Sequence, residues 1–194
     1  MSWKIEKWFE EVFPGKEYIY SEYHNLPSRE LVIVCAAVVD VALAELISFR
    51  LKNDNKEIQE FLGADGDGRA PIGSLGAKIQ LAYLLDIITK NDVEILRTIK
   101  NLRNIFAHRI KVDFTSEIIV KQLNKLAKEW KKLSIKLNPN FNCNTEKLDE
   151  IIELIGRENE AGEGLLLAIF TVYQAYFHRL RDIITRVDSF KNKK

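Results

Sequence analysis

The stretch Leu31–Val39 (LVIVCAAVV) is apolar at every position, and it decides the fold expected for this chain of 194 residues. Ser28, a residue type that commonly caps helices, comes just before this run, and the helix-favouring stretch Ala42–Leu46 (ALAEL) follows it. The β-branched residues alone would also suit a strand, but the length and the continuation favour one helix from Ser28 to about Lys52. A helix that is apolar on all sides belongs at the centre of a bundle.

Most of the remaining chain also has helical periodicity, interrupted by a few clusters of glycine, proline and asparagine. The segment Asn91–Glu94 (NDVE) has the pattern of a capping box for a helix that ends near Arg109. No convincing pair of strands is present, so the sequence predicts an all-α protein. The further helices are expected at about 2–12, 56–62, 74–88, 91–109, 116–137, 146–155 and 164–190.

The asparagine-rich break at 138–142 (NPNFN) is the best candidate for a domain boundary. We therefore expect an N-terminal amphipathic helix with an aromatic linker (1–27), a helical bundle (28–137) and a C-terminal helical extension (138–194). In the extension, apolar residues from Leu166 to Phe190 follow a seven-residue repeat, which is typical of a coiled-coil or bundle face. Such a face needs a partner, either a second subunit or another helix of the same chain.

Charge and composition limit the possible partners and compartments. The chain has 29 basic and 28 acidic residues, so binding to nucleic acid would need a local basic patch. The run Leu31–Val39 is shorter than the ~20 residues that span a bilayer, and the first residues lack a secretory apolar core. The two cysteines, Cys35 and Cys143, do not indicate a disulfide framework. We expect a cytoplasmic protein with no membrane partner.

The segment Arg103–His108 (RNIFAH) combines residues suited to phosphodiester chemistry. The planar fork of an arginine binds two phosphate oxygens, and a histidine transfers protons near neutral pH. Asn104 lies one turn before His108, where it could orient the imidazole ring. On an ideal helix Arg103 and His108 point ~140° apart, so they converge only if the helix distorts or a second subunit completes the site.

A structural interpretation of the same segment is also available. His108 and Arg109 would then only complement the dipole at the end of their helix. Asp40 interrupts the apolar central helix, so its carboxylate needs a partner or a raised pKa. That partner is either Arg103 or His108, or else a lysine or backbone donor with a structural role.

Other patterns carry less chemistry. The lysines at 121, 125, 128, 132 and 136 form a basic stripe, which is more typical of a solvated face than of an RNA-binding track. The segment Asp65–Gly68 (DGDG) lacks the later ligands of a calcium loop. The histidines and cysteines are not at metal-ligand spacing, so we expect neither a metal nor another cofactor.

Two separated motifs, Ala70–Leu84 (APIGSLGAKIQLAYL) and Ile99–His108 (IKNLRNIFAH), occur in an order that resembles the mannitol operon repressor family. That family is HEPN-like (higher eukaryote and prokaryote nucleotide-binding), and the pattern Arg-Asn-x-x-x-His near the end of a third helix is similar to the HEPN motif. The likeness covers about residues 28–137. It implies an antiparallel four-helix bundle of the HEPN type.

The resemblance implies two different functions. Many HEPN proteins are metal-independent endoribonucleases of toxin–antitoxin or defence systems, and their motif arginine and histidine form a composite site in a homodimer. Arg103 and His108 match these residues, so RNA and an antitoxin become expected partners. The mannitol repressor-like branch is instead regarded as regulatory. This chain shows no helix-turn-helix with a basic recognition helix, so a regulator of this kind would act in transcriptional regulation through protein contacts.

Overall fold

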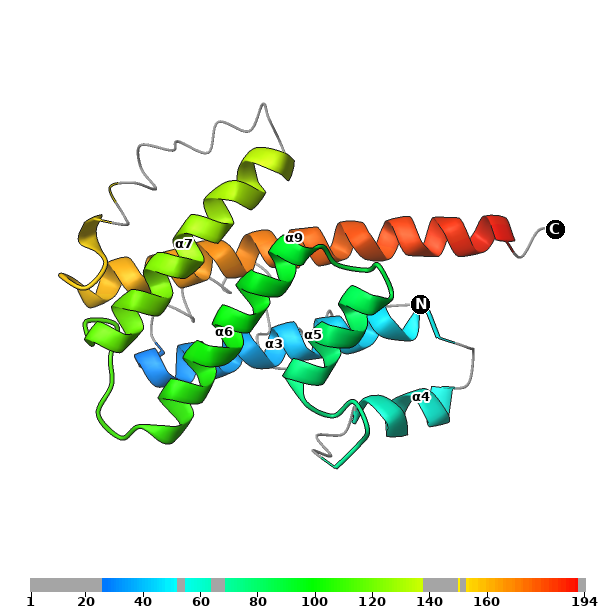
Figure 1. Ribbon diagram of the computed structural model, residues 1–194, viewed down its shortest axis with the longest axis horizontal. Coiled ribbons are helices and arrows are strands. Elements are labelled where there is room, and N and C mark those ends of the chain that lie inside the picture. The colour runs from blue at the N-terminus through cyan, green and yellow to red at the C-terminus, as the bar shows by residue number, and fades with distance from the viewer. Residues whose placement is uncertain (1–25, 52–54, 64–68, 138–149, 151–152, 192–194) are drawn as a thin grey trace.

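A computed structural model of the chain describes residues 26–51, 55–63, 69–137, 150 and 153–191. Every secondary-structure element in the described residues is an α-helix (Figure 1). The only β-type pairing among these residues is an isolated bridge between Ile155 and Glu158. The all-α prediction is therefore confirmed. The principal helices are α3 (Ser28–Ser48), α4 (Asn55–Leu62), α5 (Leu75–Leu84), α6 (Lys90–His108), α7 (Glu117–Leu137) and α9 (Asn159–Lys191).

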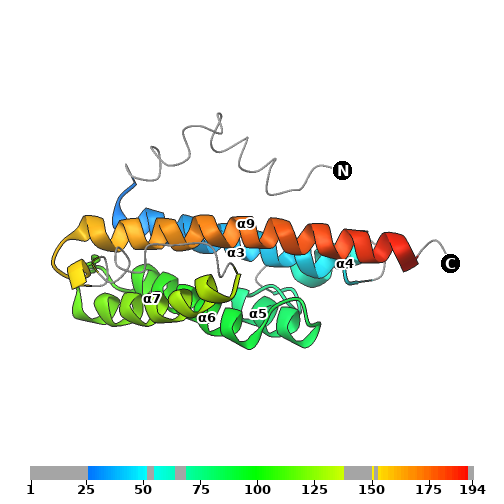
Figure 2. The ribbon, with the colours of Figure 1, turned by 90° about the horizontal axis from the view of Figure 1, so that it is seen from above.

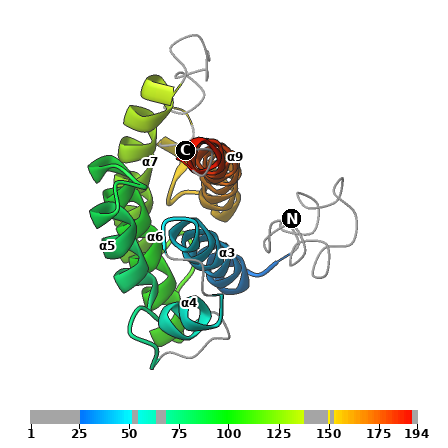
Figure 3. The same ribbon diagram turned by 90° about the vertical axis from the view of Figure 1, so that its right-hand side faces the viewer.

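The apolar helix α3 lies at the centre, in contact with α5, α6 and α9. Seen from the side, α5, α6 and α7 form one layer, and α3 and α9 lie together against it (Figures 2 and 3). With 21 residues, α3 is long and apolar enough to cross a membrane, which the nine-residue run Leu31–Val39 was not. However, 56% of its apolar window is buried inside the protein, as in the core helix of a bundle.

Helix α9 belongs to the same core as α3 and α7, with which it makes its contacts. It begins at Asn159, about one turn before the predicted start at Gly164. Leu166 and Ile169 of the predicted seam are buried, but Ile183 is 49% exposed. Farther along, Phe177 and Ile184 are buried, and Leu180 of the predicted seam packs against the core. The buried side of α9 thus includes Ile184 in place of Ile183, and part of the predicted seam is covered within one chain.

One predicted helix cap is confirmed and two are corrected. Ser28 begins α3 but its side chain does not cap the helix, because Pro27 is at the N-cap position and the Ser28 hydroxyl donates a hydrogen bond to Glu163. The Ser74 side chain accepts a hydrogen bond from the Ala77 amide and caps α5, as the sequence indicated. The capping box of α6 uses Thr89 and Asp92, not the predicted Asn91 and Glu94. The Asp92 carboxylate accepts hydrogen bonds from the Thr89 amide and hydroxyl, both at 2.7 Å, so the helix starts at Lys90. The predicted helices at 2–12 and 146–155 and the break at 138–142 lie wholly or largely outside the described residues.

Phe114 joins three parts of the fold just beyond the end of α6. Its ring lies 5.6 Å from the ring of Phe106 on α6, and both side chains are fully buried. On the other side, α9 approaches so closely that a Cβ atom at Gly162 would lie 2.9 Å from the Phe114 Cβ atom. Glycine is therefore required at position 162, and the loop from α6 to α7 is held against α9.

The buried thiol of Cys35 provides a test of how tightly α3 is packed. Burial raises its pKa from 9.0 to about 12, which lowers the thiolate fraction about a thousandfold. In a Cys143→Ser variant, we expect a thiol reagent at pH 8 to modify Cys35 at least about a thousandfold more slowly than in denaturant, as followed by absorbance. Equal rates in the two conditions would contradict the burial of α3.

Candidate functional site

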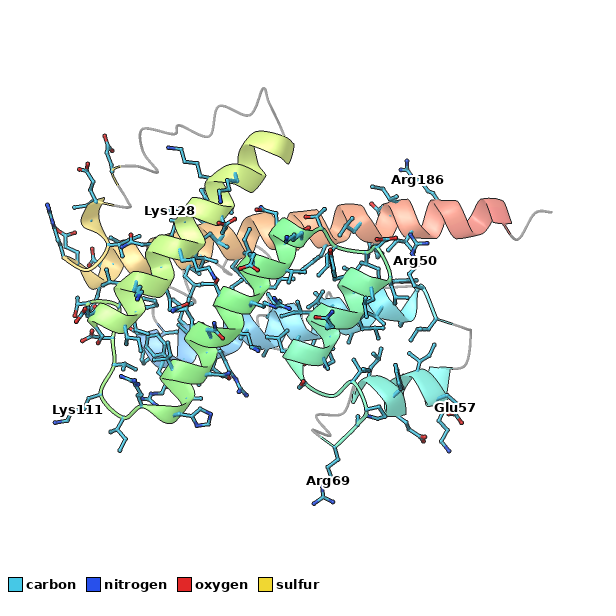
Figure 4. All side chains as sticks on the ribbon, viewed as in Figure 1. Arg50, Glu57, Arg69, Lys111, Lys128 and Arg186 are labelled. Carbon is cyan, nitrogen blue, oxygen red and sulfur yellow. The ribbon has the colours of Figure 1, made fainter. Side chains whose placement is uncertain are left out.

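The sequence motif Arg103–His108 forms the last turns of α6. Leu102 and Phe106 are fully buried and hold this end of the helix in the core. Arg103 and His108 lie on the other sides of the helix, and both are exposed. Figure 4 shows this end of α6 leading into the loop that carries Lys111. The apolar anchors therefore position a backbone from which the motif side chains project into solvent.

Arg29, in the first turn of α3, binds the end of α6. Its Nη2 atom donates hydrogen bonds to the carbonyl oxygens of Arg109 and Ile110, at 2.7 and 2.8 Å. These are carbonyls just beyond the helix end, and a charged donor binds them strongly. Sequence reasoning missed Arg29. One available signal was its place at a helix N-terminus, where the helix dipole disfavours a cation and a retained arginine indicates another role.

The His108 side chain forms no hydrogen bond within the part of the chain that the structure describes. It is the basic residue in the last turn of α6, so it still complements the helix dipole, as the structural interpretation requires. The hydrogen bonds to the neighbouring carbonyls, however, come from Arg29. The imidazole nitrogens are thus not used by the fold described here.

Arg103 and Asn104 are joined to each other. Arg103 Nη1 donates a hydrogen bond to Asn104 Oδ1 at 3.2 Å, on the exposed surface. This contact turns the guanidinium toward the helix face that Asn104 shares with His108, four residues later. Helix α6 remains α-helical as far as His108, so it lacks the distortion that convergence within one chain would need. The alternative of a second subunit is left open.

Asp40 is paired with a lysine and not with either motif residue. Lys78 Nζ lies 2.7 Å from Asp40 Oδ2, and the lysine side chain is only 2% exposed. The pair joins α3 to α5, so it corresponds to the structural alternative for Asp40. Of the two alternatives left open for the partner of Asp40, the described structure has the lysine, because Lys78 reaches the carboxylate from the neighbouring helix. Sequence analysis did not single out Lys78.

The charges around the motif form only a local basic patch. Arg109 and Lys111 are exposed beside His108, but Asp113 follows closely. Along α7, Lys125 lies 3.3 Å from Glu94 and Lys132 lies 2.7 Å from Glu129. These pairs favour the interpretation of the lysine stripe as a solvated face. Figure 4 places Lys128, from the same stripe, on α7 and away from Lys111.

In the ranges that the structure describes, no three histidine, cysteine, aspartate or glutamate side chains lie close enough to hold a metal ion. The expectation that the chain needs no metal or cofactor stays a prediction. Comparison of the chain with protein-family models, with curated proteins and with solved structures gave no match. The similarity to HEPN and mannitol repressor-like proteins therefore stays a prediction too.

Removing Lys78 tests the structural role of Asp40. A Lys78→Met variant leaves the Asp40 carboxylate without its partner, and its Oδ1 atom already has no hydrogen bond in the described structure. Because Asp40 is partly exposed, we expect the free energy of unfolding to fall by about 1–3 kcal/mol in urea denaturation. The double variant Lys78→Met, Asp40→Leu should recover much of this loss. A fully stable Lys78→Met protein would contradict the pair's role.

The loop after the motif contains a second testable carboxylate. Asp113 Oδ1 accepts hydrogen bonds from the Thr115 hydroxyl, the Ser116 hydroxyl and the Thr115 amide, and these lower its pKa below the usual 3.8. The ionised form is thus favoured by folding, and its contribution is lost as the pH falls through the lowered pKa.

We expect Asp113→Ala to reduce the free energy of unfolding at pH 7 by about 0.5–1 kcal/mol, because the site is exposed. The difference from wild type should shrink as the pH falls below 3.8. Denaturation curves across this range measure it. A difference that stays constant down to pH 2.5 would show that the ionised form of Asp113 has no special role.

Proposed function

We propose that this chain is a metal-independent endoribonuclease of the HEPN type, with a toxin-like or defence-like role, and that it acts as a homodimer. One observation supports this choice above the others. Arg29 supplies the hydrogen bonds at the end of α6, while Arg103 and His108 are exposed there on a firmly anchored helix. Side chains that the fold does not use can serve a ligand, and their chemistry suits a phosphodiester.

The proposed reaction needs no group beyond the side chains and the RNA. The 2′-hydroxyl of one nucleotide attacks the adjacent phosphorus, and the bond to the 5′-oxygen of the next nucleotide breaks. His108 takes the proton from the 2′-hydroxyl or supplies one to the departing 5′-oxygen, with water completing the balance. Arg103 binds the phosphate oxygens as negative charge builds on them. The products are a 2′,3′-cyclic phosphate and a 5′-hydroxyl end.

Asn104 has a positioning role in this proposal. Its Oδ1 atom already accepts a hydrogen bond from Arg103, and it lies on the same helix face as His108. It therefore restricts the arginine fork to the side on which the histidine lies. Asp40, a secondary candidate from the sequence, has no direct part, because Lys78 binds it between α3 and α5.

The dimer is part of the proposal for a geometric reason. In a regular helix Arg103 and His108 point ~140° apart, and α6 is regular as far as His108. Two copies of the motif brought together by a twofold axis would supply an arginine from one subunit beside a histidine from the other. One subunit would then act on the 2′-hydroxyl and the other on the leaving oxygen. We expect sedimentation at micromolar concentration to give a species of twice 22.4 kDa, and a monomer would contradict this arrangement.

The second candidate is a non-catalytic regulator that acts through protein contacts, like the mannitol operon repressor family. Ile110, two residues after the motif, is 91% exposed and would add an apolar contact to such a surface. The net charge of +1 and the pairing of Lys125 and Lys132 with glutamates also reduce the attraction for nucleic acid. In this function Arg103 and His108 would contribute to a contact surface.

Cleavage of RNA by the purified protein in excess chelator distinguishes the two functions. We expect His108→Ala and Arg103→Ala to lose about 10²–10⁴-fold in cleavage rate, because one proton-transfer group typically contributes this much. Arg103→Lys should stay poorly active, since a point charge does not replace the planar fork. Gel analysis of end-labelled RNA gives the rates, and mass spectrometry should find 2′,3′-cyclic phosphate ends.

The same helix offers matched controls. Arg97→Ala removes another exposed arginine of α6, one that binds Gln80, and Asn101→Ala removes an exposed asparagine one turn before Asn104. Both should cleave RNA like wild type. If wild type cleaves no RNA, or if the two alanine variants of the motif match wild type, the nuclease assignment fails. Loss of a protein partner in the motif variants, without any nuclease activity, would instead favour the regulator.

A further inference from the structure

Two adjoining segments, one in α5 and one in α6, contain basic residues but no acidic ones. Residues 70–85 and 95–112 have no aspartate or glutamate, although the whole chain has 28 acidic residues. Both sequence motifs, 70–84 and 99–108, lie within these segments, and α5 packs beside α6 (Figure 1). This part of the molecule therefore carries more positive charge than the net charge of +1 suggests.

The Lys100 side chain crosses from α6 to the start of α5. A Cβ atom added at Gly76, in the first turn of α5, would lie 3.4 Å from the Lys100 Nζ atom. The described residues offer this ammonium group neither a hydrogen bond nor an ion pair. Because the first turn of a helix carries partial positive charge, this position does not stabilise a cation. The fold thus leaves the charge of Lys100 uncompensated.

Other cations in the same region do have carboxylate partners. Arg97 lies 3.9 Å from Glu94, and Lys125 of α7 lies 3.3 Å from the same glutamate. By contrast, Lys100 and Arg103 have no carboxylate partner among the residues that the structure describes. These two are three residues apart on α6, so their Cβ atoms are ~5–6 Å from each other. Neighbouring cations without carboxylates attract an anion.

We propose that Lys100 binds a second phosphate of the RNA strand that is cleaved at Arg103 and His108. Lys100 extends over α5 and Arg103 extends toward Asn104, so the two cations reach different positions. Lys100 and His108 are ~12 Å apart along a regular helix, which leaves room for successive phosphates of one strand. Lys100 is then a positioning residue, and the substrate is an RNA strand longer than the two nucleotides at the cleaved bond. The identity of this substrate rests on the proposed nuclease function.

A purely structural role would use only the methylene groups of Lys100. Its Cδ atom would lie 3.6 Å from a Cβ atom at Gly76, so the aliphatic part of the side chain covers the first turn of α5. Lys100→Met keeps most of this packing and removes the charge, whereas Lys100→Arg keeps a charge. The two variants separate the roles, because phosphate binding needs the charge and packing does not.

Binding of an RNA that cannot be cleaved tests the charge directly. A labelled 2′-O-methyl oligonucleotide of about 10 nucleotides is titrated at several salt concentrations, with fluorescence anisotropy as the readout. Lys100→Met should bind about fivefold more weakly at low salt. The slope of log affinity against log salt should become shallower by about 0.7, the change for one phosphate contact to a single strand. Lys100→Arg should keep the wild-type slope.

Lys128→Met is the matched control. Lys128 is an exposed lysine of α7 that lies away from Lys111 and the motif (Figure 4). Its replacement makes the same change in net charge as Lys100→Met, so it should bind RNA like wild type if the effect belongs to one site. Urea denaturation should find Lys100→Met as stable as wild type.

Cleavage separates positioning from catalysis. On an oligonucleotide, Lys100→Met should lower kcat/KM about fivefold, in proportion to the binding that it loses. On a dinucleoside monophosphate, which has a single phosphodiester, it should cleave like wild type, whereas His108→Ala should lose activity on both substrates. An equal loss by Lys100→Met on both substrates would place Lys100 at the reacting phosphate and overturn the proposal.

The binding and cleavage results distinguish a failure of this site from a failure of the nuclease assignment. If Lys100→Met keeps the wild-type salt slope, or if Lys128→Met loses as much affinity, the phosphate site at Lys100 is overturned whatever the cleavage result. Absence of RNA binding by wild type overturns it too. If wild type cleaves no RNA while Lys100→Met still makes the slope shallower, the nuclease assignment fails and the phosphate site stands.

Discussion

Burial of the apolar helix α3 is the constraint on which the other elements depend. Ten of its residues are buried, and they face α5, α6 and α9. Each surrounding helix must therefore turn an apolar face inward and carry its charges outward, because a charge against α3 would lose its hydration. Asp40 is a charged residue on α3 itself. Its carboxylate is compensated by the ammonium group of Lys78, which reaches it from α5.

The end of α6 is fixed by contacts from outside its own helix. Phe106 and Phe114 pack ring against ring beneath it, Gly162 allows α9 to close over Phe114, and Arg29 holds the carbonyls that follow His108. These contacts come from α3, α6, the following loop and α9, so the position of the motif depends on the whole bundle. A backbone held in this way can place exposed side chains for a ligand without those side chains contributing to its stability.

The features that could be predicted from sequence are those with local causes. Apolar periodicity and the Ser74 cap located α3 and α5, and the end of α6 was placed within one residue of His108. The capping box of α6 was misplaced by two residues, because the sequence offers two overlapping sets of polar residues. Only the geometry selects Thr89 with Asp92. In α9, neighbouring apolar residues allow two alternative seams with a seven-residue repeat. Packing in the folded chain buries Ile184 and leaves Ile183 exposed.

The sequence did not show which distant residues pair with Asp40 and with the end of α6. Nothing near Asp40 in the sequence points to Lys78, which lies 38 positions away, and nothing near His108 points to Arg29, 80 positions from the carbonyl of Arg109. These two partners change how the candidate site residues are interpreted. Lys78 assigns Asp40 to the scaffold, while Arg29 binds the carbonyls of Arg109 and Ile110 that directly follow α6.

Because Arg103 and His108 are exposed and the scaffold contacts are made by other residues, effects of the motif on function can be separated from effects on stability. An exposed hydrogen bond such as that from Arg103 to Asn104 contributes little to the free energy of unfolding. The exposed His108 side chain, which has no hydrogen bond to the described residues, contributes only through the helix dipole. Surface substitutions of this kind usually change stability by no more than about 0.5 kcal/mol. A large effect of Arg103 or His108 on any activity would therefore report chemistry or binding, whereas the same effect at Asp40 would be confounded by the loss of its pair with Lys78.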